Sequence, residues 1–185
     1  MTVLYITRHG ETEYNRLGLF MGQEDIELNE NGLYQAHELG KKTKDMDIDF
    51  ILTSPLSRAR RTAKIVKSYI NKEIRIDKRL QERDAGKYEG LTMQELKDNF
   101  QKGFSDDMVQ VYNEVPPGGE SANEVQERVF SALEDIKQNF PDKKILIITH
   151  SFITKMINKY FNPDILAKEF FAFNLKNTEI KEFEF

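Results

Sequence analysis

Three short and almost wholly apolar runs constrain the fold of this chain more than any other feature. They are VLYIT at residues 3–7, FILT at residues 50–53 and ILIIT at residues 145–149. Apolar runs of this length, without alternating polar positions, are typical of strands buried on both faces of a parallel sheet. Helical patterns lie between them, so the sequence predicts an α/β fold with helices on both faces of the sheet.

Each run is followed closely by side chains that can bind an anion. Arg8 and His9 follow the first run, Arg58 follows the second after a short loop, and His150 follows the third. The ligand crevice of an open α/β sheet lies beyond the carboxyl ends of its strands, so parallel neighbouring strands would bring these four side chains to one edge. Two histidines and two arginines at one crevice indicate a site for a phosphate group.

Cap and turn signals predict the elements between these strands. Asn29 can cap a helix that runs to about residue 44, and an apolar stripe predicts a second helix over residues 56–70. Further helices should start at the capping boxes Thr92 to Glu95 and Ser121 to Glu124, the latter helix ending near residue 140. Other expected elements are a strand at 74–76, a loop at 80–90, a helix at 152–161, and a terminal hairpin or edge strand formed by 172–175 and 179–185.

Length, charge and cysteine content exclude several classes of function. The 185 residues suffice for one domain with a substantial core. No apolar stretch approaches the ~20 residues of a membrane span and the N-terminus carries no secretory pattern, so we expect a cytoplasmic protein without a membrane partner. Having no cysteine, the chain cannot use disulfides, thiolate catalysis or cysteine-ligated metals. A net charge of −4 argues against general binding of nucleic acids.

Six motifs occur in the order found in one known family. They are RHGET at 8–12 followed by Asn15; Gly22 with Asp25 and Leu28; SPLSRA at 54–59 with Thr62 and Ala63; LQER at 80–83 with Gly86, Glu89 and Gly90; PGGES at 117–121; and Thr149 with His150. In these motifs the chain resembles the histidine phosphatase superfamily, also called phosphoglycerate mutase-like. It looks most like the α-ribazole phosphatase and broad-specificity phosphatase branch of that superfamily. The resemblance implies a three-layer α/β/α sandwich with a mostly parallel central sheet. It also implies a single domain over residues 1–185, with a lid-like helical segment around residues 92–118.

The resemblance also implies roles for the residues at the strand ends. His9 would be the nucleophile, and Arg8, Arg58 and His150 would hold the phosphoryl group. Glu82 would be the proton donor. These five residues are therefore the predicted catalytic residues.

Three further residues are candidates for phosphate binding. Asn15 could add a neutral donor, and Gly22 belongs to the second motif. Ser151 stands where the family usually has glycine, so a backbone conformation that only glycine tolerates is in question there, although its amide can still bind an anion. Met21 stands where glutamine or threonine is frequent, which removes a polar contact to the substrate.

The chemistry of phosphate esters supports the same roles. A phosphomonoester is nearly a dianion at neutral pH, so it repels an anionic nucleophile but not the neutral imidazole of His9. Guanidinium groups bind the equatorial oxygens with fixed charge, and His150, if protonated, would add another cation. With so many cations no metal or other cofactor is required. The leaving alkoxide needs a proton from a neutral acid, so we expect the pKa of Glu82 to be raised.

Two other functions and several other residues compete with this interpretation. A phosphoglycerate mutase would return the phosphoryl group to a second hydroxyl, and a non-catalytic scaffold would only bind a phosphate group. Mutases of the superfamily are typically longer, and this chain retains all five catalytic residues, so hydrolysis of a small-molecule phosphate ester is favoured. Glu11, Glu89 and Glu120 are rivals of Glu82 for the acid role.

The sequence leaves substrate and oligomeric state open. His37 is expected to be structural, and Arg60 and Arg61 to lie on a solvated surface. Specificity is expected to come from residues 86–118. Within them four large side chains at helical spacing predict a core or lid helix: Phe100, Phe104, Met108 and Tyr112.

Overall fold

The computed structural model describes residues 1–99 and 115–185, and a five-stranded sheet forms its centre. The strands are β1 (Val3–Arg8), β2 (Phe50–Thr53), β3 (Glu73–Ile76), β4 (Lys144–Thr149) and β5 (Ile180–Glu184). Their order across the sheet is β3-β2-β4-β1-β5. The first four strands are parallel, whereas β5 pairs with β1 in the antiparallel direction. The predicted mostly parallel sheet is therefore confirmed.

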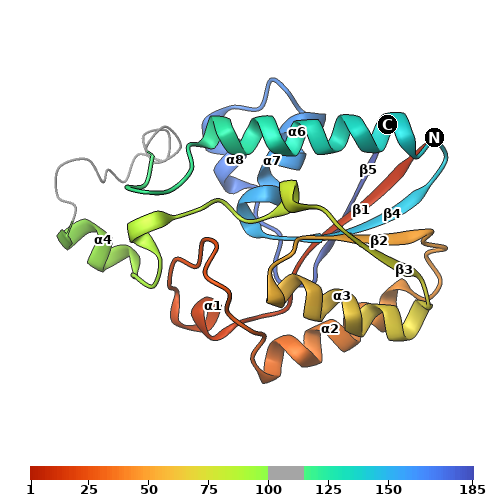
Figure 1. The fold of residues 1–185 in the computed structure, drawn as a ribbon, viewed down its shortest axis with the longest axis horizontal. Coiled ribbons are helices and arrows are strands. Elements are labelled where there is room, and N and C mark those ends of the chain that lie inside the picture. The colour runs from red at the N-terminus through yellow and green to blue at the C-terminus, as the bar shows by residue number, and fades with distance from the viewer. Residues whose placement is uncertain (100–114) are drawn as a thin grey trace.

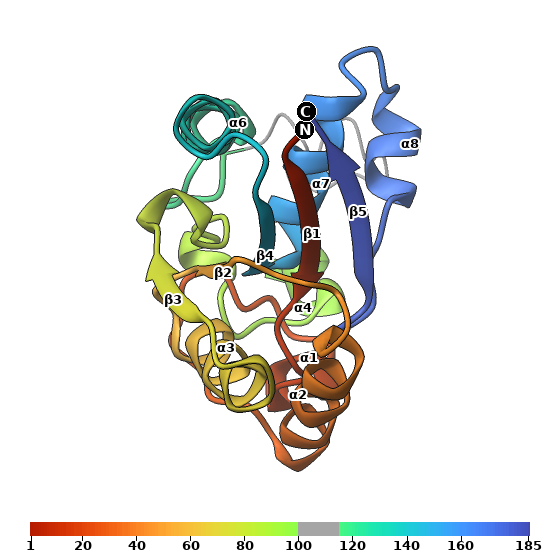
Figure 2. The same cartoon turned by 90° about the vertical axis from the view of Figure 1, so that its right-hand side faces the viewer.

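Helices cover both faces of this sheet, which confirms the three-layer sandwich. Helices α2 (Glu30–Thr43) and α3 (Ser57–Ile70) lie on one face, and α6 (Ala122–Asn139), α7 (Ser151–Phe161) and α8 (Ala167–Ala172) lie on the other (Figures 1 and 2). Two shorter helices, α1 (Glu13–Leu17) and α4 (Met93–Asn99), lie beyond the carboxyl ends of the strands (Figure 1). The two termini lie side by side, because β1 and β5 run in opposite directions.

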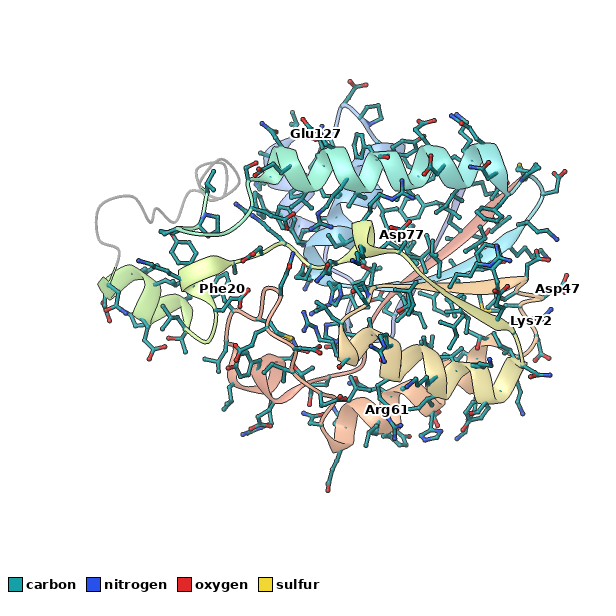
Figure 3. The ribbon with its side chains drawn as sticks, in the orientation of Figure 1. Phe20, Asp47, Arg61, Lys72, Asp77 and Glu127 are labelled. Carbon is teal, nitrogen blue, oxygen red and sulfur yellow. The ribbon has the colours of Figure 1, made fainter. Side chains whose placement is uncertain are left out.

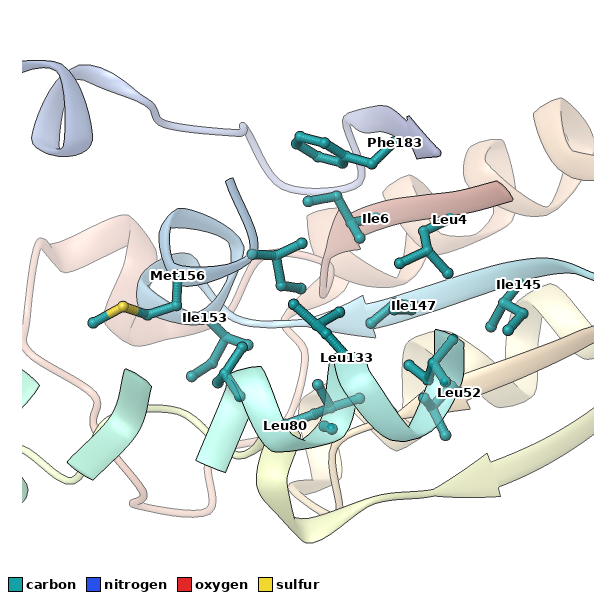
Figure 4. Close-up of a cluster of buried hydrophobic side chains, with 14 of the residues drawn as sticks. Leu4, Ile6, Leu52, Leu80, Leu133, Ile145, Ile147, Ile153, Met156 and Phe183 are labelled. Atoms are coloured by element: carbon teal, nitrogen blue, oxygen red, sulfur yellow. The ribbon is translucent and has the colours of Figure 1, made fainter. Parts of the chain in front are cut away.

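Strand β4 shows why its sequence is apolar throughout. Ile145 and Ile147 pack into the cluster shared with α6 and α7, part of which is drawn in Figure 4. Leu146 and Ile148 pack on the opposite side, in the cluster shared with α2 and α3. Successive side chains of a strand point to opposite faces, so a strand between two helical layers buries both sets. Burying each such side chain contributes about 1.5–3 kcal/mol.

The helix starts lie where the cap signals predict them. Asn29 accepts a hydrogen bond from the amide of Gly32, and α2 begins at the next residue. Ser121 and Glu124 form the reciprocal capping box at the start of α6. Thr92 and Glu95 form the same pair of bonds before α4.

The C-terminal segment was predicted only in part. The edge strand is confirmed as β5, but the hairpin alternative is wrong, because residues 167–172 form α8 and β5 pairs with the N-terminal strand. Residues 172–175 alternate in the pattern of a strand, yet Ala172 ends α8 and Leu175 packs into the core without belonging to a strand. The loop predicted at 80–90 contains one turn of 3₁₀ helix, η2 (Gly86–Tyr88), and follows another, η1 (Lys78–Leu80).

Part of the predicted lid-like segment at 92–118 is the helix α4. The four large side chains at 100, 104, 108 and 112 lie outside the described residues. No helix within residues 1–99 and 115–185 has both the length and the apolar character needed to cross a bilayer.

Candidate active site

The two histidines meet at the carboxyl ends of β1 and β4. These strands pair with Arg8 opposite Thr149, so the residues that follow, His9 and His150, leave the sheet side by side. Their ring centroids are 5.2 Å apart, and both side chains are buried. The register of two adjacent parallel strands thus creates the pair.

His9 is held as a neutral imidazole of one tautomer. Its Nδ1 donates to the carbonyl oxygen of Gly10 at 2.6 Å. A carbonyl can only accept, so the proton is on Nδ1 and the lone pair is on Nε2. Burial, followed by the charges of Arg58 and Arg8, lowers the pKa of His9 well below its ordinary value. Nε2 is therefore available as a nucleophile at neutral pH.

His150 is anchored through its Nε2, and its Nδ1 has no hydrogen-bond partner. Its Nε2 lies 2.7 Å from the hydroxyl oxygen of Ser54, which also accepts a bond from the amide of Leu56. The hydroxyl proton can then be donated to Nε2, which leaves the imidazole proton on Nδ1. Burial and the charge of Arg58 lower the pKa of His150 well below its ordinary value. In this structure the pKa of His150 therefore favours the neutral imidazole, not the cation considered from the sequence.

Arg8 and Arg58 lie near the two histidines and are oriented by backbone carbonyls. The four side chains His9, His150, Arg8 and Arg58 are called the cradle below. Arg58 is fully buried, and its two terminal nitrogens donate to the carbonyl oxygens of Gly22 and Glu24, both at 2.7 Å. Burial lowers the pKa of Arg58 to about 10, so it stays charged at neutral pH. Arg8 donates through Nη1 to the carbonyl oxygen of Leu175 at 2.8 Å.

Three buried side-chain nitrogens of the predicted site residues have no hydrogen-bond partner. Among the described residues, the buried side-chain nitrogen and oxygen atoms without a hydrogen bond are Arg8 Nε, Arg58 Nε and His150 Nδ1. Leaving one such group unpaired costs about 1–3 kcal/mol, so native proteins seldom tolerate it without a functional reason. All three belong to predicted site residues, and all three can donate to an anion.

Glu82 lies in the loop after η1, close enough to Arg8 and Arg58 for its charge to act on both. Its two carboxylate oxygens accept bonds from the amides of Arg83, at 2.8 Å, and Phe152, at 3.3 Å. Removal of the carboxyl from water raises the pKa of Glu82, although Arg8 and Arg58 act in the opposite direction. The shift has the direction predicted for a proton donor.

The three rival carboxylates have structural partners. Glu11 accepts from the side chain of Asn29, and Glu89 accepts from the amide of Gln23. Glu120 forms an ion pair with Arg128. Glu82 is the carboxylate whose charge acts on both Arg8 and Arg58.

The three candidates for phosphate binding are placed differently from one another. Asn15 uses its side-chain oxygen to cap α1 with Thr12. Gly22 supplies the carbonyl that orients Arg58, as described above. Ser151 begins α7 without a positive φ, so glycine is not required at that position.

The remaining polar residues singled out in the sequence lie away from the cradle. His37 is exposed and contacts the hydroxyl of Tyr69. Arg60 and Arg61 line a separate surface cavity of about 420 Å³ that includes none of the predicted site residues. Figure 3 labels Arg61 on α3, beside α2.

Three residues of the site were not found from the sequence. Ser54 orients His150, as described above. Asn177 donates to the backbone oxygen of His9 at 2.8 Å from the turn before β5. Lys155 of α7 donates to the carbonyl oxygens of Phe171 and Phe173, and burial lowers its pKa to about 8. Ser54 is part of the SPLSRA motif, whereas the other two have no sequence signal.

This fold, this cradle of two histidines and two arginines, and the carboxyl of Glu82 define a protein that transfers phosphoryl groups. The family model of the histidine phosphatase superfamily (branch 1) matches residues 4–185, so the chain belongs to that superfamily, whose members are phosphatases or mutases. The resemblance inferred from the motifs is thereby confirmed.

Individual relatives are consistent with this membership. The chain is 37% identical to the uncharacterized phosphatase PhoE of Bacillus subtilis, over 81% of this chain and 72% of the relative. A phosphoserine phosphatase mutant from Entamoeba histolytica, solved in complex with phosphoserine, is 32% identical with a TM-score of 0.84, over 100% and 91% of the two chains. The α-ribazole phosphatase of Shigella flexneri has a TM-score of 0.86 over 97% and 89%, but at 24% identity this likeness shows the fold alone.

Proposed function

We propose that the protein is a phosphomonoester hydrolase that forms a phosphohistidine on His9, with a small phosphorylated metabolite as its substrate. The observation that carries the proposal is the set of three unpaired buried donors, on Arg8, Arg58 and His150, beside an imidazole with its lone pair on Nε2. The oxygens of one phosphoryl group can accept from all three donors. The proposed reaction uses no metal and no cofactor.

The first half of the reaction moves the phosphoryl group to the protein. Nε2 of His9 attacks phosphorus, and the bond between phosphorus and the ester oxygen breaks. Protonated Glu82 gives its proton to that oxygen, which leaves as an alcohol. The arginines and His150 stabilise the charge on the equatorial oxygens.

The second half restores the protein. Ionised Glu82 takes a proton from a water molecule, whose oxygen attacks the phosphorus of phosphohistidine. The bond from phosphorus to Nε2 then breaks and inorganic phosphate leaves. Glu82 is protonated again and can start the next cycle.

A small metabolite is the substrate class that the relatives favour. The Entamoeba histolytica relative was solved with phosphoserine. A panel of phosphorylated amino acids, sugars, glycerates and nucleosides, ranked by kcat/KM, would identify the substrate, because that ratio measures discrimination.

The test of the mechanism is turnover of p-nitrophenyl phosphate in the presence of EDTA. We expect steady release of nitrophenolate, loss of activity in His9→Ala, and full activity in the control His37→Ala. Rapid quenching and mass spectrometry should locate phosphate on His9. Phosphate on another side chain would refute the proposal. Faster transfer to an added alcohol than to water would identify a mutase, and no turnover of any ester would identify a scaffold.

A further inference from the structure

A single arginine of α6 holds the backbone of the loop that carries Glu82. Nη1 of Arg128 donates to the carbonyl oxygens of Arg79 and Gln81, both at 2.7 Å, and Nη2 donates to that of Glu82 at 3.1 Å. Its Nε and Nη2 also donate to the carboxylate of Glu120, at 2.9 and 2.8 Å. A guanidinium has five N–H donors, so every donor of Arg128 is used.

Glu120 holds the same loop from its other side. Its carboxylate accepts a bond from the amide of Asp84 at 2.9 Å, and its own amide donates to the carbonyl oxygen of Asp84 at 3.0 Å. The PGGES motif brings it there. A Cβ on Gly119 would lie 2.4 Å from the carbonyl oxygen of Asp84, so only glycine allows this close approach. The motif therefore packs against the loop of Glu82.

The position of the Glu82 carboxyl depends on this backbone. One of its two hydrogen bonds comes from Arg83, its neighbour in the same loop, and the other comes from Phe152 in α7. A shift of the loop relative to α7 would therefore move the carboxyl away from the ester oxygen. Misplacement by about 1 Å can lower a catalysed rate about 100-fold.

We propose that Arg128, paired with Glu120, is a positioning residue for the proton donor Glu82. The proposal rests on the role of Glu82 in the proposed function. Arg128 acts through the backbone of residues 79–84, because all five of its N–H donors are already used by that backbone and by Glu120. Lysine cannot replace it, because an ammonium has three donors and cannot reproduce the planar fork.

The test compares two esters in Arg128→Lys. p-Nitrophenyl phosphate releases a stable phenolate that needs no proton, whereas phosphoserine releases an alkoxide that does. We expect kcat/KM to fall about 100-fold for phosphoserine and much less for the nitrophenyl ester. The ratio kcat/KM reports only the steps up to the first phosphoryl transfer, so the later role of Glu82 as a base does not affect the comparison.

Arg75→Lys is the matched control. Arg75 lies in β3, outside residues 79–84, and its guanidinium is partly exposed and pairs with exposed Glu73. We expect both esters to keep kcat/KM within about fivefold. Thermal unfolding of each variant shows whether it is folded.

Glu82→Gln separates the possible outcomes. The positioning role would be overturned if Glu82→Gln lowered kcat/KM selectively for phosphoserine while Arg128→Lys lowered kcat/KM equally for both esters. If Glu82→Gln itself lowered kcat/KM equally for both esters, the proton-donor role would be overturned instead. Should Arg128→Lys not fold, Glu120→Gln takes its place, because its one side-chain oxygen can still accept from the amide of Asp84, while the ion pair and the bond from Nε of Arg128 are lost. It should show the same selectivity, and equal losses on both esters would again overturn the proposal.

Discussion

Gly22→Ala tests whether the second motif acts by orienting Arg58. Gly22 has φ +49°, a region in which an alanine costs about 1–2 kcal/mol. A Cβ at this position would lie 2.0 Å from Oε1 of Glu89. That oxygen accepts a bond from the amide of Gln23 at 2.7 Å, and losing a bond to a charged group costs about 1.5–3 kcal/mol. We therefore expect Gly22→Ala to lower the free energy of unfolding by about 2.5–5 kcal/mol.

Gly18→Ala is the matched control for this change. Gly18 also has a positive φ, +69°, but a Cβ there would meet no atom within 4 Å. The free energy of unfolding of Gly18→Ala should fall only by the backbone cost of about 1–2 kcal/mol. Urea unfolding of the two variants and of the unchanged protein measures both values.

The effect on activity should also differ between the two glycines. The carbonyl of Gly22 accepts from Nη2 of Arg58, so a displaced backbone moves the guanidinium. We expect kcat/KM for p-nitrophenyl phosphate to fall up to about 100-fold in Gly22→Ala and to stay unchanged in Gly18→Ala. Equal stability and equal activity of the two variants would refute this explanation.

Three further changes test the electrostatics of the cradle. With an alkyl phosphate as substrate, kcat/KM should fall on the acid side only below the usual pKa of histidine, because the pKa of His9 is lowered. On the basic side kcat/KM should fall as Glu82 loses its proton. Glu82→Gln should abolish this basic limb of the profile, and an unchanged basic limb would contradict the role of Glu82. Arg58→Lys keeps a charge but loses the planar fork, so kcat/KM should fall about 10²–10³-fold in steady-state assays, and a loss below tenfold would count against a direct contact. Ser54→Ala leaves Nε2 of buried His150 without its partner and should lower the free energy of unfolding in urea by about 1–3 kcal/mol, whereas a neutral effect would mean that the hydroxyl is not needed.

The features that could be predicted from the sequence are those that a single element encodes. The three apolar runs correspond to β1, β2 and β4 because strands between two helical layers are apolar on both faces. The caps of α2 and α6 bond within three residues, so their motifs are local as well. Because both histidines directly follow such strands, their convergence could also be expected before the register was known.

The features that could not be predicted depend on contacts between distant parts of the chain. Asn177 reaches the backbone of His9 across 168 residues, and Ser54 reaches His150 across 96. No local pattern specifies these pairs. Helix α1 has only five residues, which is too short for a helical period to be visible. The choice between a hairpin and an edge strand at residues 172–185 was open because apolar residues alternate in both of its segments, and pairing of β5 with β1 decided the outcome.

One physical cause gives the residues of the cradle and Glu82 their different charges. Burial disfavours the charged form of every group, so it lowers the pKa of His9, His150 and Arg58 and raises that of Glu82. The histidines begin near neutrality and are thereby held neutral, whereas Arg58 can fall to about 10 and keep its charge. An uncharged imidazole, a fixed cation and a carboxyl that keeps its proton more readily therefore result from the same burial.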